Sequence, residues 1–346
     1  MVKNIDLDIE KYQAKVRDHP KDANAHKDLG LTYSMKGKFK DAVKEFKEAI
    51  LLDPNNAEVH LGLGIVYDSL GQLDDALGEY RETVRIDPKS VNSRLSLAAS
   101  LVANGMAEDA LPIYEELLQE KPDNVAVYNG MGLALSSAGY LDDSIEILRK
   151  ALKQQPKNYD AHTLLGDALS DNGELVEAAE EYKDAISIDP KSATAFFKLA
   201  YVLADWGDEK GAIMQYQQAI YIEPTLVEAH YNMAMLLDHR GDLDEAILEY
   251  GQVKDLDPEF PDAYNRLGID YSRTGRPDLA IAEFSMAFKL DPGFAQAHYN
   301  LGILYFGREQ YDDAITEFEK AIEINPDYLE AQNSLAIAKD KKTQKG

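Results

Sequence analysis

The chain has 346 residues and a net charge of −26, from 62 acidic and 36 Lys or Arg side chains. Phosphate backbones and anionic lipids repel such a chain, which argues against a nucleic-acid partner. Cysteine is absent, which excludes disulfides, thiolate metal ligands and a cysteine nucleophile. No apolar run approaches the ~18 residues of a membrane span, and no apolar leader follows Met1. We therefore expect a cytoplasmic protein without direct membrane insertion.

Ten prolines recur at a spacing of 34 residues along the chain. They are Pro20, Pro54, Pro88, Pro122, Pro156, Pro190, Pro224, Pro258, Pro292 and Pro326. Proline lacks a backbone N–H and clashes with the preceding turn, so it stops a helix. A helix stop at a fixed period predicts one structural unit that is copied along a solenoid.

The units can be assigned in chain order by counting from these prolines. Residues 1–22 look like the second half of a unit, because Ile9, Tyr12 and Val16 form a helical stripe. The nine full units that follow are 23–56, 57–90, 91–124, 125–158, 159–192, 193–226, 227–260, 261–294 and 295–328. Residues 329–346 begin another helix and then turn polar, as a capping helix does. No linker interrupts the array, so we expect no second domain.

Within each unit the pattern predicts a helical hairpin. Helix A is expected over roughly positions 2–14, and helix B from about position 18 to the proline. A glycine at position 15 supplies the left-handed residue that ends helix A. The ninth unit has Glu309 there and Gly307 two residues earlier, which predicts a shifted turn. Small residues at positions 8 and 20 let the two helices approach, and a ring at position 24 fills the space beside them.

This pattern is similar to the tetratricopeptide repeat over essentially the whole chain. The eighth unit carries it as Leu267-Gly268, Tyr271, Gly275, Ala280, Phe284, Ala287 and Pro292. The resemblance implies an all-α fold, a right-handed α-solenoid superhelix of helix-turn-helix hairpins. It would consist of nine full repeats, an N-terminal half-repeat and a C-terminal capping helix. It also implies that helix A lines a concave groove.

Five histidines share position 4 of their units, where the family places a large ring. They are His26, His60, His162, His230 and His298. We interpret them as packing side chains rather than metal ligands, because no cysteine and no i, i+4 histidine pair accompanies them. Burial disfavours a charged imidazole, so we expect acid to loosen the array near their pKa.

The sequence offers no catalytic motif. Gly62-x-Gly64 and Gly130-x-Gly132 resemble parts of a dinucleotide loop, but both fall inside a predicted helix and follow no strand. A phosphate-binding loop, a nucleophile elbow and a zinc-protease motif are all missing from the sequence. We therefore predict a protein that is not an enzyme, with no catalytic residues, no cofactor and no metal.

The predicted binding surface lies on helix A of units six to nine, because helix A lines the groove in the resembled family. The candidate peptide-binding residues are Phe197, Lys198, Tyr201, Tyr231, Asn232, Asn265, Arg266, Arg273, Tyr299 and Asn300. Asparagines at position 6 could pair with a peptide backbone, and the aromatic rings could anchor its side chains. The three basic residues could meet a carboxylate of the partner. The alternative for the asparagines is that they simply follow the family consensus.

We predict a non-catalytic scaffold or adaptor that binds a peptide or helix of a partner protein in this groove. A chaperone-type carboxylate clamp is disfavoured, because Leu31 and Gly62 occupy two of its positions. Two alternatives stay open. The chain could self-associate as a scaffold of a larger assembly, using the vacancy beside the half-repeat at 1–22. It could also be a regulatory subunit of an enzyme or of a secretion complex.

Overall fold

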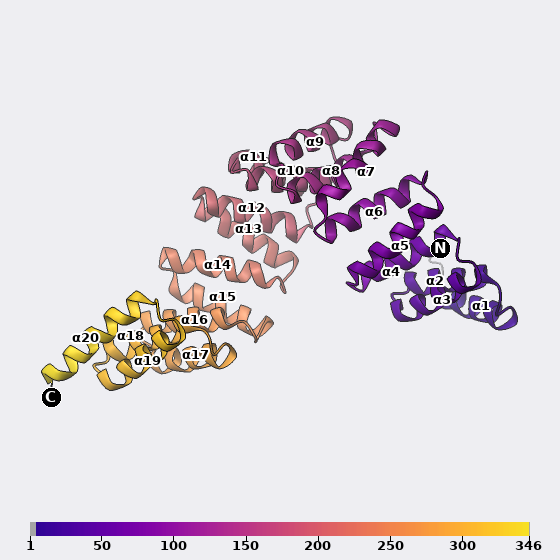
Figure 1. Cartoon of the computed structure of the whole chain (residues 1–346). Coiled ribbons are helices and arrows are strands. Elements are labelled where there is room, and N and C mark those ends of the chain that lie inside the picture. The colour runs from indigo at the N-terminus through magenta and orange to yellow at the C-terminus, as the bar shows by residue number, and fades with distance from the viewer. Residues whose placement is uncertain (1–4, 346) are drawn as a thin grey trace. The chain divides into compact units, whose positions relative to one another are not determined.

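The computed structural model describes residues 5–345, and the secondary structure over this range consists of helices joined by short turns (Figure 1). This confirms the predicted all-α class and the helical-repeat solenoid architecture. The helices group into two compact units, residues 1–188 and residues 189–346.

The helices of the first unit are α1 (Ile5–Asp18), α2 (Ala23–Met35), α3 (Phe39–Leu52), α4 (Ala57–Ser69), α5 (Leu73–Ile86), α6 (Val91–Ala103), α7 (Ala107–Glu120), α8 (Val125–Ser137), α9 (Leu141–Gln154), α10 (Tyr159–Asp171) and α11 (Leu175–Ile188). The helices of the second unit are α12 (Ala193–Trp206), α13 (Glu209–Ile222), α14 (Val227–Arg240), α15 (Leu243–Leu256), α16 (Pro261–Arg273), α17 (Pro277–Leu290), α18 (Ala295–Gly307), α19 (Tyr311–Ile324) and α20 (Leu329–Lys345). From α2 to α19, even-numbered helices are the A helices and odd-numbered helices are the B helices. None of the described helices is long and apolar enough to cross a membrane.

Each hairpin closes on a large side chain at position 24 of its B helix. Eight of these are rings that are at most 2% exposed: Phe46, Tyr80, Tyr114, Tyr182, Tyr216, Tyr250, Phe284 and Phe318. The fourth hairpin has the fully buried Leu148 instead. Small residues at position 8 of the A helices face these side chains; a Cβ built on Gly268 would lie 2.6 Å from Cε1 of Phe284. In the six hairpins with glycine at position 8, the close approach of the A and B helices therefore depends on the missing side chain.

Left-handed residues end the A helices, as the position-15 glycines predict. Eight of these glycines have φ between 71° and 91°: Gly37, Gly71, Gly105, Gly139, Gly173, Gly207, Gly241 and Gly275. The predicted shift of the ninth turn is wrong. Helix α18 runs through Gly307, and Glu309 itself adopts φ 60°. The hairpin geometry thus imposes the left-handed conformation even on a residue with a side chain.

Replacing Glu309 with glycine is expected to stabilise the second unit by about 0.5–1 kcal/mol. A side chain in the left-handed region costs energy that glycine avoids, although the more flexible unfolded chain offsets part of the gain. The measurement is the urea midpoint of unfolding. Gly275→Ala is the matched control, with φ 74° and no atom within 4 Å of an added Cβ, and should lower the midpoint. A lower midpoint for Glu309→Gly would contradict the expectation.

The start of helix A differs between the early and the late hairpins. In the first six, the preceding side chain accepts a hydrogen bond from the first helical turn and so caps the helix. These caps are Asp22, Asn56, Ser90, Asn124, Asn158 and Ser192. The same position is later apolar, and the Phe260 and Tyr328 rings pack on Tyr231 and Tyr299 at centroid distances of 5.1 and 5.0 Å. Ring packing on candidate residues therefore stands where the earlier hairpins have a cap, at the starts of α16 and α20.

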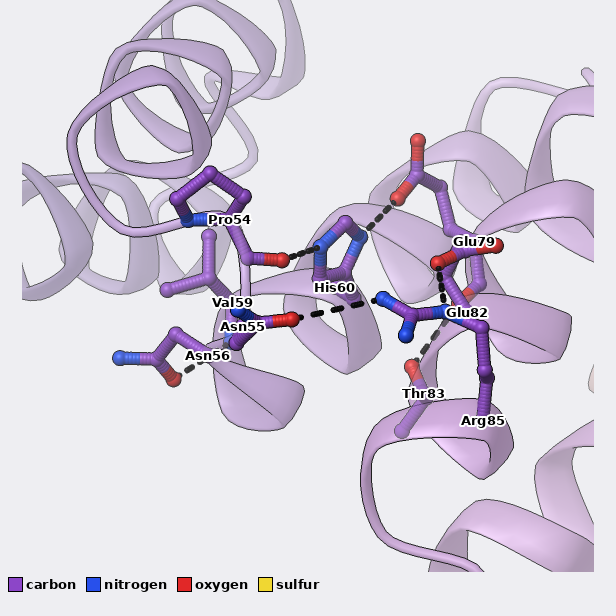
Figure 2. Close-up of polar contacts among 9 residues, drawn as sticks. All are labelled: Pro54, Asn55, Asn56, Val59, His60, Glu79, Glu82, Thr83 and Arg85. Atoms are coloured by element: carbon purple, nitrogen blue, oxygen red, sulfur yellow. Dashed lines mark hydrogen bonds and ion pairs between the residues drawn. The ribbon is translucent and has the colours of Figure 1, made fainter.

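Two hydrogen-bond acceptors hold four of the five position-4 histidines. Nδ1 of His60 lies 2.6 Å from a carboxylate oxygen of Glu79, and Nε2 lies 3.2 Å from the carbonyl oxygen of Pro54 (Figure 2). The same arrangement recurs in His26 with Glu45, His162 with Glu181 and His230 with Glu249. His298 bonds Glu317 at 2.6 Å and stacks on Phe288 with the ring centroids 4.3 Å apart.

For His230, the expectation that acid loosens the array is wrong in sign. Because His230 has an acceptor beside each ring nitrogen, it can donate both hydrogen bonds only as the imidazolium, so its charged form is favoured. At His230 the hydrogen bond with Glu249 raises the pKa above the usual range, although burial opposes the shift. The sequence contained a signal for this pairing, because each of the five units with histidine at position 4 also has glutamate at position 23.

One of these pairs has a third potential metal ligand. Around His162, ligand atoms of the ring, of Glu181 and of Asp184 all lie within 4.8 Å of one another. Both nitrogens of this ring already have hydrogen-bond partners, and Asp184 is exposed. The arrangement is therefore accounted for by a hydrogen-bonded histidine.

Candidate protein-binding site

All ten candidate binding residues lie on A helices of the second unit. Helix α12 carries Phe197, Lys198 and Tyr201; α14 carries Tyr231 and Asn232; α16 carries Asn265, Arg266 and Arg273; α18 carries Tyr299 and Asn300. These helices place them at equivalent positions of four successive hairpins. The structure assigns them different roles.

Three of the candidate aromatic rings pack within their own hairpins. Phe197, Tyr231 and Tyr299 are partly buried, and each contacts the position-24 ring of the same hairpin with centroids 5.7 to 5.9 Å apart. Tyr201 differs, because it is 56% exposed. The three packed rings therefore support the hairpins, and Tyr201 is the ring best placed to contact a partner.

The asparagines form bonds within the chain. Asn300 donates through Nδ2 to Oδ1 of Asn265 at 2.9 Å. Asn265 is only 1% exposed, so it supports Asn300 rather than lining the surface. Asn232 hydrogen-bonds the Tyr216 hydroxyl. Because a carboxamide has two donor hydrogens and two acceptor lone pairs, one such bond leaves further capacity on each partly buried position-6 asparagine.

The two candidate arginines are paired with aspartates. Nε of Arg266 lies 3.5 Å from an oxygen of Asp262. Arg273 reaches back to contact Asp238 and lies 3.4 Å from Oδ1 of Asp270. A carboxylate of a partner would have to compete with these internal pairs, so the arginines are weaker candidates for anion binding than the sequence indicated. Lys198 is partly buried on α12.

An apolar column runs along the A helices and was mostly missed by sequence reasoning. One apolar residue stands at position 9 of each A helix of the second unit and of α20. The column consists of Tyr201, Met235, Ile269, Ile303 and Ile337. Four of the five are 39% to 56% exposed, and Ile269 is partly buried. The signal was their exact 34-residue spacing, at a position the family pattern already assigns to the groove.

A buried carboxylate lies beside this column. Asp270 is fully buried, and its Oδ2 and the hydroxyl of the fully buried Tyr250 have no hydrogen-bond partner among the described residues. Burial and the charge of Asp238 raise the pKa of Asp270 to about 7, although Arg273 opposes the shift. Sequence reasoning missed this group. An aspartate at position 10, where the other units have uncharged residues, was the available signal.

Comparison with known families assigns the repeat. Tetratricopeptide repeat models match residues 95–158, 129–193, 193–226, 215–248 and 295–328, and a further TPR repeat model matches residues 35–71 and 239–275. No curated protein matches the chain. The chain belongs to the tetratricopeptide repeat family, a class of protein–protein interaction scaffolds that are typically non-catalytic.

Two solved tetratricopeptide repeat structures show the same fold. The C-terminal part of a TPR repeat-containing protein from Cytophaga hutchinsonii is 16% identical, with a TM-score of 0.61, and the match covers 70% of this chain and 99% of that one. A tetratricopeptide repeat protein from Parabacteroides merdae is 17% identical, with a TM-score of 0.50, and the match covers 71% and 98%. MamA is 28% identical, with a TM-score of 0.46, and the match covers 48% and 97%.

Proposed function

We propose that the chain is a non-catalytic scaffold that binds a peptide or helix of a partner protein on the A helices of repeats six to nine. The apolar column carries this proposal. A segment with apolar side chains at regular spacing would cover several of its members at once. Each Å² of apolar surface removed from water contributes ~25 cal/mol. Tyr201 supplies the exposed aromatic side chain that is typical of an interface centre.

Two further features support the same surface. The position-6 side chains Asn232 and Asn300 border the column and offer hydrogen bonds to a bound backbone. Packed rings hold the A helices in place, which reduces the ordering that binding would require. The surface is therefore suited to a partner segment that presents an apolar face and a polar flank.

Loss of the column is expected to weaken peptide binding. Peptides are selected from a random display library on the full chain, and the affinity of each is then measured by calorimetry. The variant Tyr201→Ser, Met235→Ser, Ile303→Ser should weaken binding at least tenfold, about 1.4 kcal/mol. The control Met214→Ser, Tyr221→Ser, Leu248→Ser removes three exposed apolar side chains from B helices and should bind normally. Selected peptides that bind both variants as they bind the wild type would exclude this surface.

A further inference from the structure

Asp270 is charged at a position that is uncharged in the other hairpins. Position 10 of helix A there holds Thr32, Val66, Ser100, Ala134, Ala168, Val202, Leu236 and Leu304. A buried carboxylate costs free energy unless its hydrogen bonds and charge are satisfied, and one oxygen of Asp270 has no partner among the described groups. The eighth hairpin therefore carries a destabilising group at this position, which is typical of a functional site.

The carboxyl groups of Asp238 and Asp270 lie together between α14 and α16. When one of them is protonated, a hydrogen bond joins the two side chains. Arg273 contacts both, and Arg266 interacts with Asp270 while pairing with Asp262. Three carboxylates thus meet two guanidinium groups, and one negative charge is left in excess when all are ionised.

The Tyr250 hydroxyl lacks the hydrogen bond that the equivalent hydroxyl makes in the second hairpin. In the second hairpin the Tyr80 hydroxyl donates to Asp68 at 2.5 Å. Asp238 occupies the equivalent position of the seventh hairpin, but it pairs with Arg273 and leaves the buried Tyr250 hydroxyl unpartnered among the described residues. Asp238 therefore pairs with an arginine, whereas Asp68 in the second hairpin accepts a hydrogen bond from a tyrosine.

Apolar side chains flank the two carboxylates. Met235 lies one turn before Asp238 on α14, and Ile269 lies one turn before Arg273 on α16, so each shares a helix face with the cluster. The side chains of Asp238 and Arg273 are 16% and 46% exposed. A partner segment that covers the apolar column at these two repeats would also cover the exposed edge of the cluster.

We propose that this cluster receives the guanidinium or ammonium group of an arginine or lysine from an amphipathic segment of the partner protein. The inference rests on the proposed function and names the chemistry of its partner. The basic group contacts Asp238 from the exposed side and neutralises the excess charge, while apolar residues of the same segment cover Met235 and Ile269. The net charge of −26 attracts a basic segment at long range.

Binding of a cation at this cluster is coupled to proton loss from Asp270. Its carboxyl group, with a pKa raised to about 7, is surrounded by Asp238 on α14, Tyr250 on α15 and both arginines on α16. A nearby positive charge favours the ionised carboxylate. The affinity should therefore rise by up to about tenfold between pH 6 and pH 8.

The test uses two synthetic amphipathic peptides with leucines at identical helical positions. One has lysine and the other glutamate at its polar positions, and calorimetry measures their affinity for the full chain. The lysine peptide should bind more tightly, and more so at pH 8 than at pH 6. The variant Asp238→Asn, Asp270→Asn should weaken its binding at least tenfold and remove the pH dependence.

A charge-matched control separates a specific site from general attraction. Asp244→Asn, Asp278→Asn removes two carboxylates that are 74% and 94% exposed at the starts of B helices, and it should bind like the wild type. Equal losses in both double variants, or preference for the glutamate peptide, would overturn the inference. Library peptides that require the apolar column but are not enriched in lysine or arginine would also overturn it and leave the proposed function standing. Failure of every library peptide to depend on the column would refute the proposed function itself.

Discussion

The free energy of unfolding is expected to increase by about 1 kcal/mol, from Asp270 alone, when the pH is lowered from 8 to 6. Burial and Asp238 raise the pKa of this carboxyl group to about 7 in the folded protein, well above its value in an unfolded chain. The folded state therefore binds a proton more readily, and its stability is gained as the pH falls through 7. His230 acts in the same direction.

The sign for His230 follows from its hydrogen bonds. Glu249 and the carbonyl group of Pro224 raise its pKa in the folded state, so its contribution is fully present below the unfolded pKa of ~6.5. That contribution is lost as the pH rises through the higher folded value. Both groups therefore make the second unit more stable at pH 6 than at pH 8.

Urea unfolding at pH 6, 7 and 8 measures this effect. Asp270→Asn keeps the size of the side chain and removes its titration, so the variant should lose most of the pH dependence and gain stability at pH 8. The variant Glu249→Gln should lose only the part of the pH dependence that comes from His230. If the urea midpoint of the wild type falls steadily from pH 8 to pH 6, then neither Asp270 beside Asp238 nor His230 beside Glu249 behaves as its geometry indicates.

Replacing Gly268 with valine is expected to destabilise the eighth hairpin by about 3 kcal/mol, because overpacking and a β-branched side chain act together. The added Cβ would lie 2.6 Å from the Phe284 ring, which is 1% exposed and has no free space to move into. Loss of this packing should separate α16 from α17 and so displace Asp270 and Arg266. Circular dichroism during urea unfolding measures the change.

Two controls separate crowding from helix propensity. Gly251→Val places the same side chain in the interior of α15, where nothing lies within 4 Å of an added Cβ, and it should be nearly neutral. Gly268→Ala should cost less, because it adds the Cβ without the two further methyl groups of valine, and alanine fills the same position at Ala98, Ala200 and Ala234. Equal destabilisation by the two valine variants would indicate that crowding against Phe284 is not the cause.

The repeat architecture was readable from the sequence because each signal acts over a few residues and recurs at a fixed spacing. Proline, the position-15 glycine and the ring at position 24 impose local geometry through backbone freedom and side-chain volume, and the structure follows them. The turn of the ninth hairpin shows the limit of such local signals. The glycine in the sequence predicted the left-handed residue at Gly307, but packing of α18 on α19 places it at Glu309.

The candidate site was only partly readable, because which residues share a surface depends on contacts between helices. Sequence position placed Asn265 on the surface, whereas it is buried beneath Asn300. Tyr231 looked like a free anchor, whereas it packs on Tyr250 and Phe260. These pairings join residues up to 35 positions apart, so no local pattern reveals them.

By itself, the sequence determined the class of protein, the helical hairpins and the helices on which a partner segment is proposed to bind. The periodic residues were sufficient for this, because the geometry of each hairpin is set by backbone preferences and side-chain volumes within its own repeat. Only the tertiary structure decided the hydrogen-bond partners of the histidines, the pairing of the arginines and the burial of Asp270. Charge and hydrogen bonding depend on distance in space, and the partners come from neighbouring helices that only the folded chain brings together.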